Sequence, residues 1–222
     1  MMPLAQTSPN YTALLLCLLV LIIAVPLLPA DWPGHFLELA FDLVLLAGVY
    51  SAAWSSRHRW PFIIFTLVTL GARWSDELSA HISVDAASYG LTLVWIIYAI
   101  EIVFAALYRE REVTVNLILG AIVVYLLAVV AFAELYGLIE TLQPGSLAGL
   151  PTEKVTNALI YFSFVCMTTM TFGDIVPSSN LVRSLSVVQA VFAMFYVAVM
   201  IARLVGLNIV REVTKDQSSS NR

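Results

Sequence analysis

A run of small polar residues, TTMTFGD at residues 168–174, follows an apolar stretch that starts near residue 152. Pro151, an N-capping Thr152 and Glu153 in the first turn are signals for a helix start. A helix from there to residue 167 would be roughly 24 Å long, against a hydrocarbon core of about 30 Å. We therefore expect this element to enter the membrane and return.

The chemistry open to the TTMTFGD run is that of backbone oxygen atoms. Irregular backbone at membrane depth is tolerated only where protein buries it or where it lines a water-filled path. Carbonyl groups that face such a path can replace the hydration shell of an ion. The run must therefore be buried in protein or line a path of this kind.

The same seven residues resemble the TTVGYGD signature of potassium-channel pore loops. The resemblance covers residues 114–210, because residues 116–140 are similar to the outer pore helix of bacterial members and residues 184–207 to their inner helix. It implies a tetrameric, carbonyl-lined filter, with the Thr169 hydroxyl as a further ligand. The implied ion-binding residues are Thr169, Met170, Thr171, Phe172 and Gly173, and the implied filter supports are Thr168 and Asp174.

Three positions depart from the family pattern. Thr171 stands where a glycine is usual, and a left-handed backbone there would cost a β-branched residue about 1–3 kcal/mol. We therefore expect weakened potassium selectivity. Phe172 replaces a tyrosine whose hydroxyl could brace the filter, and Ala193 stands at a hinge glycine of the inner helix. The filter should be braced less rigidly, and the gate should be stiffer.

Composition identifies an integral membrane protein. The chain has 222 residues, of which 60% are hydrophobic and 12% charged, with a mean hydropathy of +0.90. That is too little polar surface for a soluble domain of this length. The net charge of −4 excludes a basic surface for nucleic acid.

Apolar segments separated by polar loops predict an all-α fold with six membrane-spanning helices. Their expected ranges are 11–28, 36–54, 60–72, 89–108, 113–136 and 181–208, with the re-entrant helix and filter loop between the last two. The third has a short apolar core, and Arg73 would have to snorkel to the headgroups. The first could instead be a cleaved signal peptide, but it lacks a basic leader and a clear cleavage site.

These elements divide into a four-helix unit at residues 1–113, a pore domain at 114–210 and a disordered cytoplasmic tail at 211–222. The four-helix unit has the number and order of helices of a voltage sensor. Its fourth helix contains no arginine within residues 89–108, so we expect a voltage-insensitive scaffold. No soluble regulatory domain is expected.

Three acids lie within the predicted spans of the four-helix unit. Glu38 and Asp42 are one helical turn apart, and Glu101 lies in the fourth helix. Acids at such depth are usually paired or face the bundle interior, and Arg73 is the expected ion-pair partner of Glu38 or Asp42. The alternative is a proton or ion path through this unit.

Basic residues at the loop ends predict that both termini are cytoplasmic in a multi-pass protein of the cell inner membrane. This topology places eight basic residues inside and three outside. The inner set is Arg57, Arg59, Arg109, Arg111, Arg203, Arg211, Lys215 and Arg222, and the outer set is Arg73, Lys154 and Arg183. The outer face would then carry acids that either attract cations or are merely solvated: Asp31, Asp76, Glu77, Asp85, Glu140, Glu153 and Asp174.

No enzyme and no cofactor are expected. His35, His58 and His81 lie at helix ends or in loops, and no catalytic or phosphate-binding pattern is present. Cys17 and Cys166 fit small buried side chains better than a disulfide.

The predicted function is a homotetrameric channel in the lipid bilayer that passes potassium or another monovalent cation, without a bound metal besides that ion. The alternative is a non-conducting membrane subunit that retains the pore fold.

Overall fold

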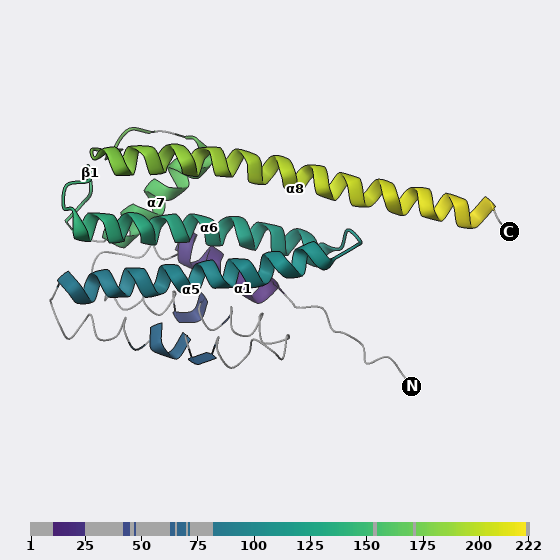
Figure 1. Ribbon diagram of the computed structural model, residues 1–222, viewed down its shortest axis with the longest axis horizontal. Helices are drawn as coiled ribbons and strands as arrows, with labels where there is room; N and C mark the ends of the chain where they lie inside the picture. The colour runs from purple at the N-terminus through teal and green to yellow at the C-terminus, as the bar shows by residue number, and fades with distance from the viewer. Residues whose placement is uncertain are drawn as a thin grey trace.

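The described part of the chain is almost entirely helical (Figure 1). The computed structural model describes residues 11–24, 42–44, 47, 63–64, 66–69, 71, 82–152, 155–170 and 172–220. Its helices are α1 (Thr12–Leu19), continued by a π-helical turn η1 (Val20–Ala24), α5 (Ile82–Arg109), α6 (Val115–Leu142), α7 (Val155–Thr168) and α8 (Asn180–Ser220). Two short strands, β1 (Leu147–Ala148) and β2 (Val176–Pro177), pair antiparallel.

Three described helices are long and apolar enough to cross a membrane. They are Ala86–Arg109, Val115–Leu142 and Asn180–Ile209, which correspond to the fourth, fifth and sixth predicted spans. The apolar helix Thr12–Ile23 covers part of the first predicted span and is shorter. Most of the second and third predicted spans lies outside the described residues, so the count of six stays a prediction.

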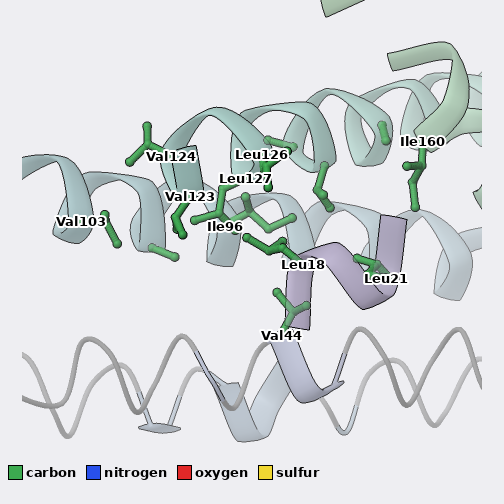
Figure 2. Packing of buried hydrophobic residues seen from close by; sticks show 14 of the residues in the cluster. Leu18, Leu21, Val44, Ile96, Val103, Val123, Val124, Leu126, Leu127 and Ile160 are labelled. Atoms are coloured by element: carbon green, nitrogen blue, oxygen red, sulfur yellow. The ribbon is translucent and has the colours of Figure 1, made fainter. Parts of the chain in front are cut away.

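α5 and α6 form an antiparallel pair, and α1 packs against α6 (Figure 1). Glycines on α6 permit the close approach, because a Cβ at Gly137 would overlap the ring of Tyr89 and one at Gly120 would overlap Leu107. Figure 2 shows the buried side chains between the helices, with those of Leu18 and Leu21 directed toward the α5–α6 pair.

α6 is the central helix of the predicted pore domain, and α7 and α8 both contact it. Within the spanning windows, 61% of α6 is buried inside the chain but only 17% of α8. Most of the apolar surface of α8 is therefore left for lipid or for another protein chain.

Side-chain caps define two helix starts. The Thr114 hydroxyl accepts a hydrogen bond from the Leu117 amide at 3.1 Å, and the Ser179 hydroxyl accepts one from the Val182 amide at 3.2 Å. α6 and α8 therefore begin within one or two residues of their predicted starts.

Two helix ends differ from expectation. α6 continues six residues beyond residue 136 to Leu142, since no proline interrupts the segment GLIETL before Pro144. α8 continues to Ser220, so the predicted disordered tail is helical. Polar composition suggested disorder there, but after Gly206 the segment contains neither glycine nor proline, and nothing interrupts the helix.

Candidate functional site

α7 is the short apolar helix that was predicted before the TTMTFGD run. Its 14 residues end at Thr168, whose hydroxyl donates to the Phe164 carbonyl at 2.7 Å. The chain then turns back, because the Thr169 amide donates to the Cys166 carbonyl at 3.3 Å and the Met170 amide to the Val165 carbonyl at 3.0 Å. The start of the filter loop is thus attached directly to the last turn of α7.

Two of the described residues in the filter loop have a left-handed backbone conformation. Thr169 has φ 58° and Gly173 has φ 82°. Thr169 is the only non-glycine residue with positive φ in the described part of the chain, and its hydroxyl donates to the Thr168 carbonyl at 2.7 Å. Thr171, where the sequence predicted strain, lies outside the described residues.

The side chains of Met170 and Phe172 are 59% and 62% exposed on the single chain. These side chains are therefore free to contact other chains or lipid. The Phe172 ring is stacked on Tyr161 of α7, with centroids 6.4 Å apart and planes 11° from parallel. One side of the loop is therefore held against the helix that precedes it.

Asp174, a predicted filter support, also contacts Tyr161. The hydrogen bond from the Tyr161 hydroxyl, together with the backbone amides of Ile175 and Asp174, lowers the pKa of the Asp174 carboxyl below its ordinary value. Asp174 is therefore ionised at neutral pH, and a fixed negative charge lies at the end of the loop.

The α6–α7 connection packs against the segment that leaves the filter loop. Leu147 pairs with Pro177 and Ala148 with Val176 in the two-stranded sheet. Gly149 has φ 86°, and a Cβ there would overlap the Asp174 carbonyl oxygen. The connection therefore needs a glycine at this contact with the filter loop.

Glu140, predicted as a surface acid, organises this connection. Its carboxylate accepts hydrogen bonds from the Gly145 amide at 2.6 Å and the Leu147 amide at 3.0 Å. Arg183, predicted on the same face, donates from Nε to the Pro177 carbonyl at 3.1 Å. Both side chains stabilise the chain around the filter loop.

A buried polar network joins α6, α7 and α8 behind the filter loop. Gln189 of α8 lies between Tyr136 of α6 and Ser163 of α7, and all three side chains are completely inaccessible to solvent. The Tyr136 hydroxyl donates to Gln189 Oε1 at 2.7 Å, and Gln189 Nε2 donates to Ser163 Oγ at 2.8 Å and to the Ser163 carbonyl at 3.0 Å. Ser163 Oγ in turn donates to the Val129 carbonyl at 2.6 Å.

Arg203 joins α8 to α5 at the opposite end of the bundle. Its guanidinium donates to the carbonyl oxygens of Leu107 and Glu110, the latter at 3.3 Å, and its Cζ lies 4.9 Å from the centre of the Tyr108 ring. It therefore binds carbonyls at the end of α5 and just beyond it, and the Leu107 carbonyl also accepts the Glu110 amide at 3.2 Å. The contact brings Arg203 to the same end as Arg109 and Arg111.

The predicted intramembrane acids have different environments. Asp42 is 7% exposed and is buried as expected, whereas Glu38 and Arg73 lie outside the described residues. Glu101 is exposed on α5, so the expectation that it faces the bundle interior is wrong for the single chain. Its position on the helix directs it away from the α1–α6 side.

Sequence reasoning missed the buried polar residues of the pore domain. Glu134 is 2% exposed within α6, and Tyr136, Ser163 and Gln189 form the network described above. The available signal was a lone polar residue in an apolar run, as in AFAELYG and SVVQAVF. Buried polar groups are costly unless they are hydrogen-bonded, so such residues predict specific partners.

Comparison with known proteins identifies the domain that contains these residues. Residues 112–208 match the family model described as ion channel. Neither the curated proteins nor the solved structures gave a match to the chain. The match spans α6, α7, the filter loop and the membrane part of α8, and it confirms the resemblance to potassium-channel pores.

Proposed function

Because residues 112–208 are a potassium-channel-like ion channel domain, we propose that the chain forms a homotetrameric channel for potassium or another monovalent cation. The observation that carries the proposal is the filter loop, TTMTFGD, which follows a helix too short to span and is attached to its end. The permeant ion would bind carbonyl oxygens of Thr169, Met170, Thr171, Phe172 and Gly173, with Thr168 and Asp174 as supports.

Charge around the filter loop supports a cation as the permeant ion. The carboxyl end of α7 carries the partial negative charge of the helix dipole and ends at the loop. The ionised Asp174 adds a full negative charge at the other end of the loop. A cation is therefore favoured at both ends of the proposed filter.

Tetrameric assembly is supported by the surface of α8 and by the filter loop itself. One loop supplies a quarter of a ring of carbonyls, so a closed filter requires four chains. Exposed apolar side chains on α8, among them Phe192, Phe195 and Val199, would be covered by neighbouring chains and by lipid.

The proposed topology has six spans and both termini in the cytoplasm, in the cell inner membrane. The shared location of Arg109, Arg111 and Arg203 at the end of the bundle opposite Asp174 supports this orientation. The four-helix unit would act as a scaffold that is not voltage-gated, since no arginine precedes Arg109 in α5.

Flux and mass measured on one preparation test the proposal. Purified protein in liposomes should pass potassium down its gradient, and native mass spectrometry in detergent should give four chains per particle. A particle no larger than a dimer would overturn the proposal of a tetrameric pore. Four chains without flux for any monovalent cation would instead favour the non-conducting membrane subunit, in which Thr171 has disabled the filter.

A further inference from the structure

We propose that Gln189 is a positioning residue that sets the ion selectivity of the filter from behind, through α7. The inference rests on the proposed channel function. Gln189 lies in α8, is completely buried, and would not line the ion path. Its influence on the filter would be exerted through its hydrogen bonds to the neighbouring helices.

Gln189 uses both ends of its side-chain amide on different helices. Oε1 accepts the Tyr136 hydroxyl from α6 at 2.7 Å, while Nε2 donates to both oxygen atoms of Ser163 on α7. Nε2 also lies 3.8 Å from the Met167 sulfur. A glutamine supplies a donor and a strong acceptor at this reach, whereas leucine supplies neither, methionine supplies only a weak acceptor, and an ionised glutamate supplies no donor.

Hydroxyl groups form further hydrogen bonds between α6 and the helices α7 and α8. Tyr136 Oη lies 3.3 Å from Ser186 Oγ, and Ser163 Oγ donates to the Val129 carbonyl of α6. One turn further along, the Tyr125 hydroxyl donates to the Met167 carbonyl of α7 at 3.3 Å. α7 is therefore attached by hydrogen bonds at two successive turns, and a buried polar network of this kind favours one arrangement over alternatives.

The path from Ser163 to the filter is short and continuous. Ser163 lies one turn before Cys166 and Met167 on α7. The carbonyls of Val165 and Cys166 accept the amides of Met170 and Thr169, the first two proposed ion-binding residues. A shift or rotation of α7 at Ser163 would therefore displace the first carbonyls of the filter.

Selectivity depends on small displacements of these carbonyls, so it reports the position of α7 more directly than total flux does. A residue that only stabilises the fold would change the amount of assembled channel but not the permeability ratio of the channels that remain. The permeability ratio for potassium over sodium is therefore the informative measurement.

The test compares bi-ionic reversal potentials of native protein and Gln189→Met, each confirmed as assembled by native mass spectrometry. We expect the ratio to change by about fivefold, the equilibrium equivalent of one net hydrogen bond. Ser184→Ala is the matched control on the same helix, because Ser184 is exposed and takes part in none of the hydrogen bonds of the network. It should leave the ratio close to the native value.

A second variant, Ser163→Ala, tests the same hydrogen-bond network if Gln189→Met does not assemble. Ser163→Ala leaves α8 unchanged and removes the 2.8 Å acceptor of Gln189, so it should change the ratio in the same direction. An unchanged ratio in assembled Gln189→Met or Ser163→Ala channels, with cation flux in the native protein, would overturn this inference alone. Absence of flux in the native protein would overturn it together with the proposed function.

Discussion

Thr171 is the residue at which this filter departs most from its family pattern. A glycine at this position lets the backbone adopt positive φ, and a threonine there costs about 1–3 kcal/mol per chain if the same conformation is kept. Four chains would share strain of up to roughly 10 kcal/mol, comparable with the stability of a whole domain. A relaxed backbone with fewer aligned carbonyls is the expected outcome.

The first prediction follows from this strain. The native channel should discriminate weakly between potassium and sodium, and Thr171→Gly should increase the discrimination, as measured by bi-ionic reversal potentials. Thr171→Ala is the control, since it also carries a Cβ and should not restore selectivity. Strong potassium selectivity in the native channel, unchanged by glycine, would show that threonine fits the filter.

The second prediction concerns the Tyr161–Asp174 hydrogen bond. The pKa of Asp174 in the folded protein lies below its ordinary value of 3.8, chiefly because of the Tyr161 hydroxyl. A depressed carboxyl pKa contributes stability that is present above the unfolded pKa and is lost as pH falls through the folded pKa. Asp174 should therefore stay ionised between about pH 5 and pH 8, and its titration should not change cation flux in that range.

Tyr161→Phe removes the hydroxyl and keeps the ring that is stacked on Phe172. The pKa of Asp174 should then rise toward 3.8, so acid inactivation of flux should begin at a higher pH than in the native protein. Tyr108→Phe, at the opposite end of the bundle, is the control. Identical acid profiles for Tyr161→Phe and native protein would contradict the assigned role of this hydrogen bond.

At the scale of elements, the α6–α7 connection acts as a support for the loop that leaves the filter. Gly145 and Gly149 have nearly equal φ values of 85° and 86°. An added Cβ at Gly145 would meet nothing within 4 Å, whereas one at Gly149 would overlap the Asp174 carbonyl. An alanine at Gly145 therefore tests only the cost of the backbone conformation, whereas an alanine at Gly149 adds the cost of the steric overlap.

The third prediction uses this pair. Gly145→Ala should lower the free energy of unfolding by roughly 1–2 kcal/mol, the cost of a left-handed backbone for a residue with a Cβ. Gly149→Ala should lower it by about 1–3 kcal/mol more, because the contact with the filter loop must open. Thermal unfolding of the purified protein in detergent measures both, and equal melting temperatures would exclude the close contact.

At the scale of the whole molecule, α5 packs along its length against α6, and its end is bound by Arg203 of α8. The fourth prediction is that the open probability depends little on membrane potential, because no arginine precedes Arg109 in α5. Voltage sensors move about 3–4 charges per chain. An effective gating charge of that size in single-channel recordings would contradict the prediction and direct attention to Arg73.

The sequence by itself indicated a membrane protein and predicted the place of the proposed filter. Hydropathy and length predicted the spans that became α5, α6 and α8, since an apolar helix long enough to cross is recognisable from local composition. The filter residues and α7 are contiguous, so their spacing carried the resemblance that the family match confirms. Among the described helices, the tail and the end of α6 differ from the prediction, because the breakers that would end these helices are absent.

The tertiary structure alone decided which polar residues pack around the TTMTFGD loop. Tyr136 and Gln189 are 53 residues apart, and Gln189 and Ser163 are 26 apart, so their contact depends on the register of three packed helices. Glu140 and Gly149 likewise acquire their roles from the way the α6–α7 connection folds onto the filter loop. Such contacts form between distant segments, and no local pattern of residues specifies them.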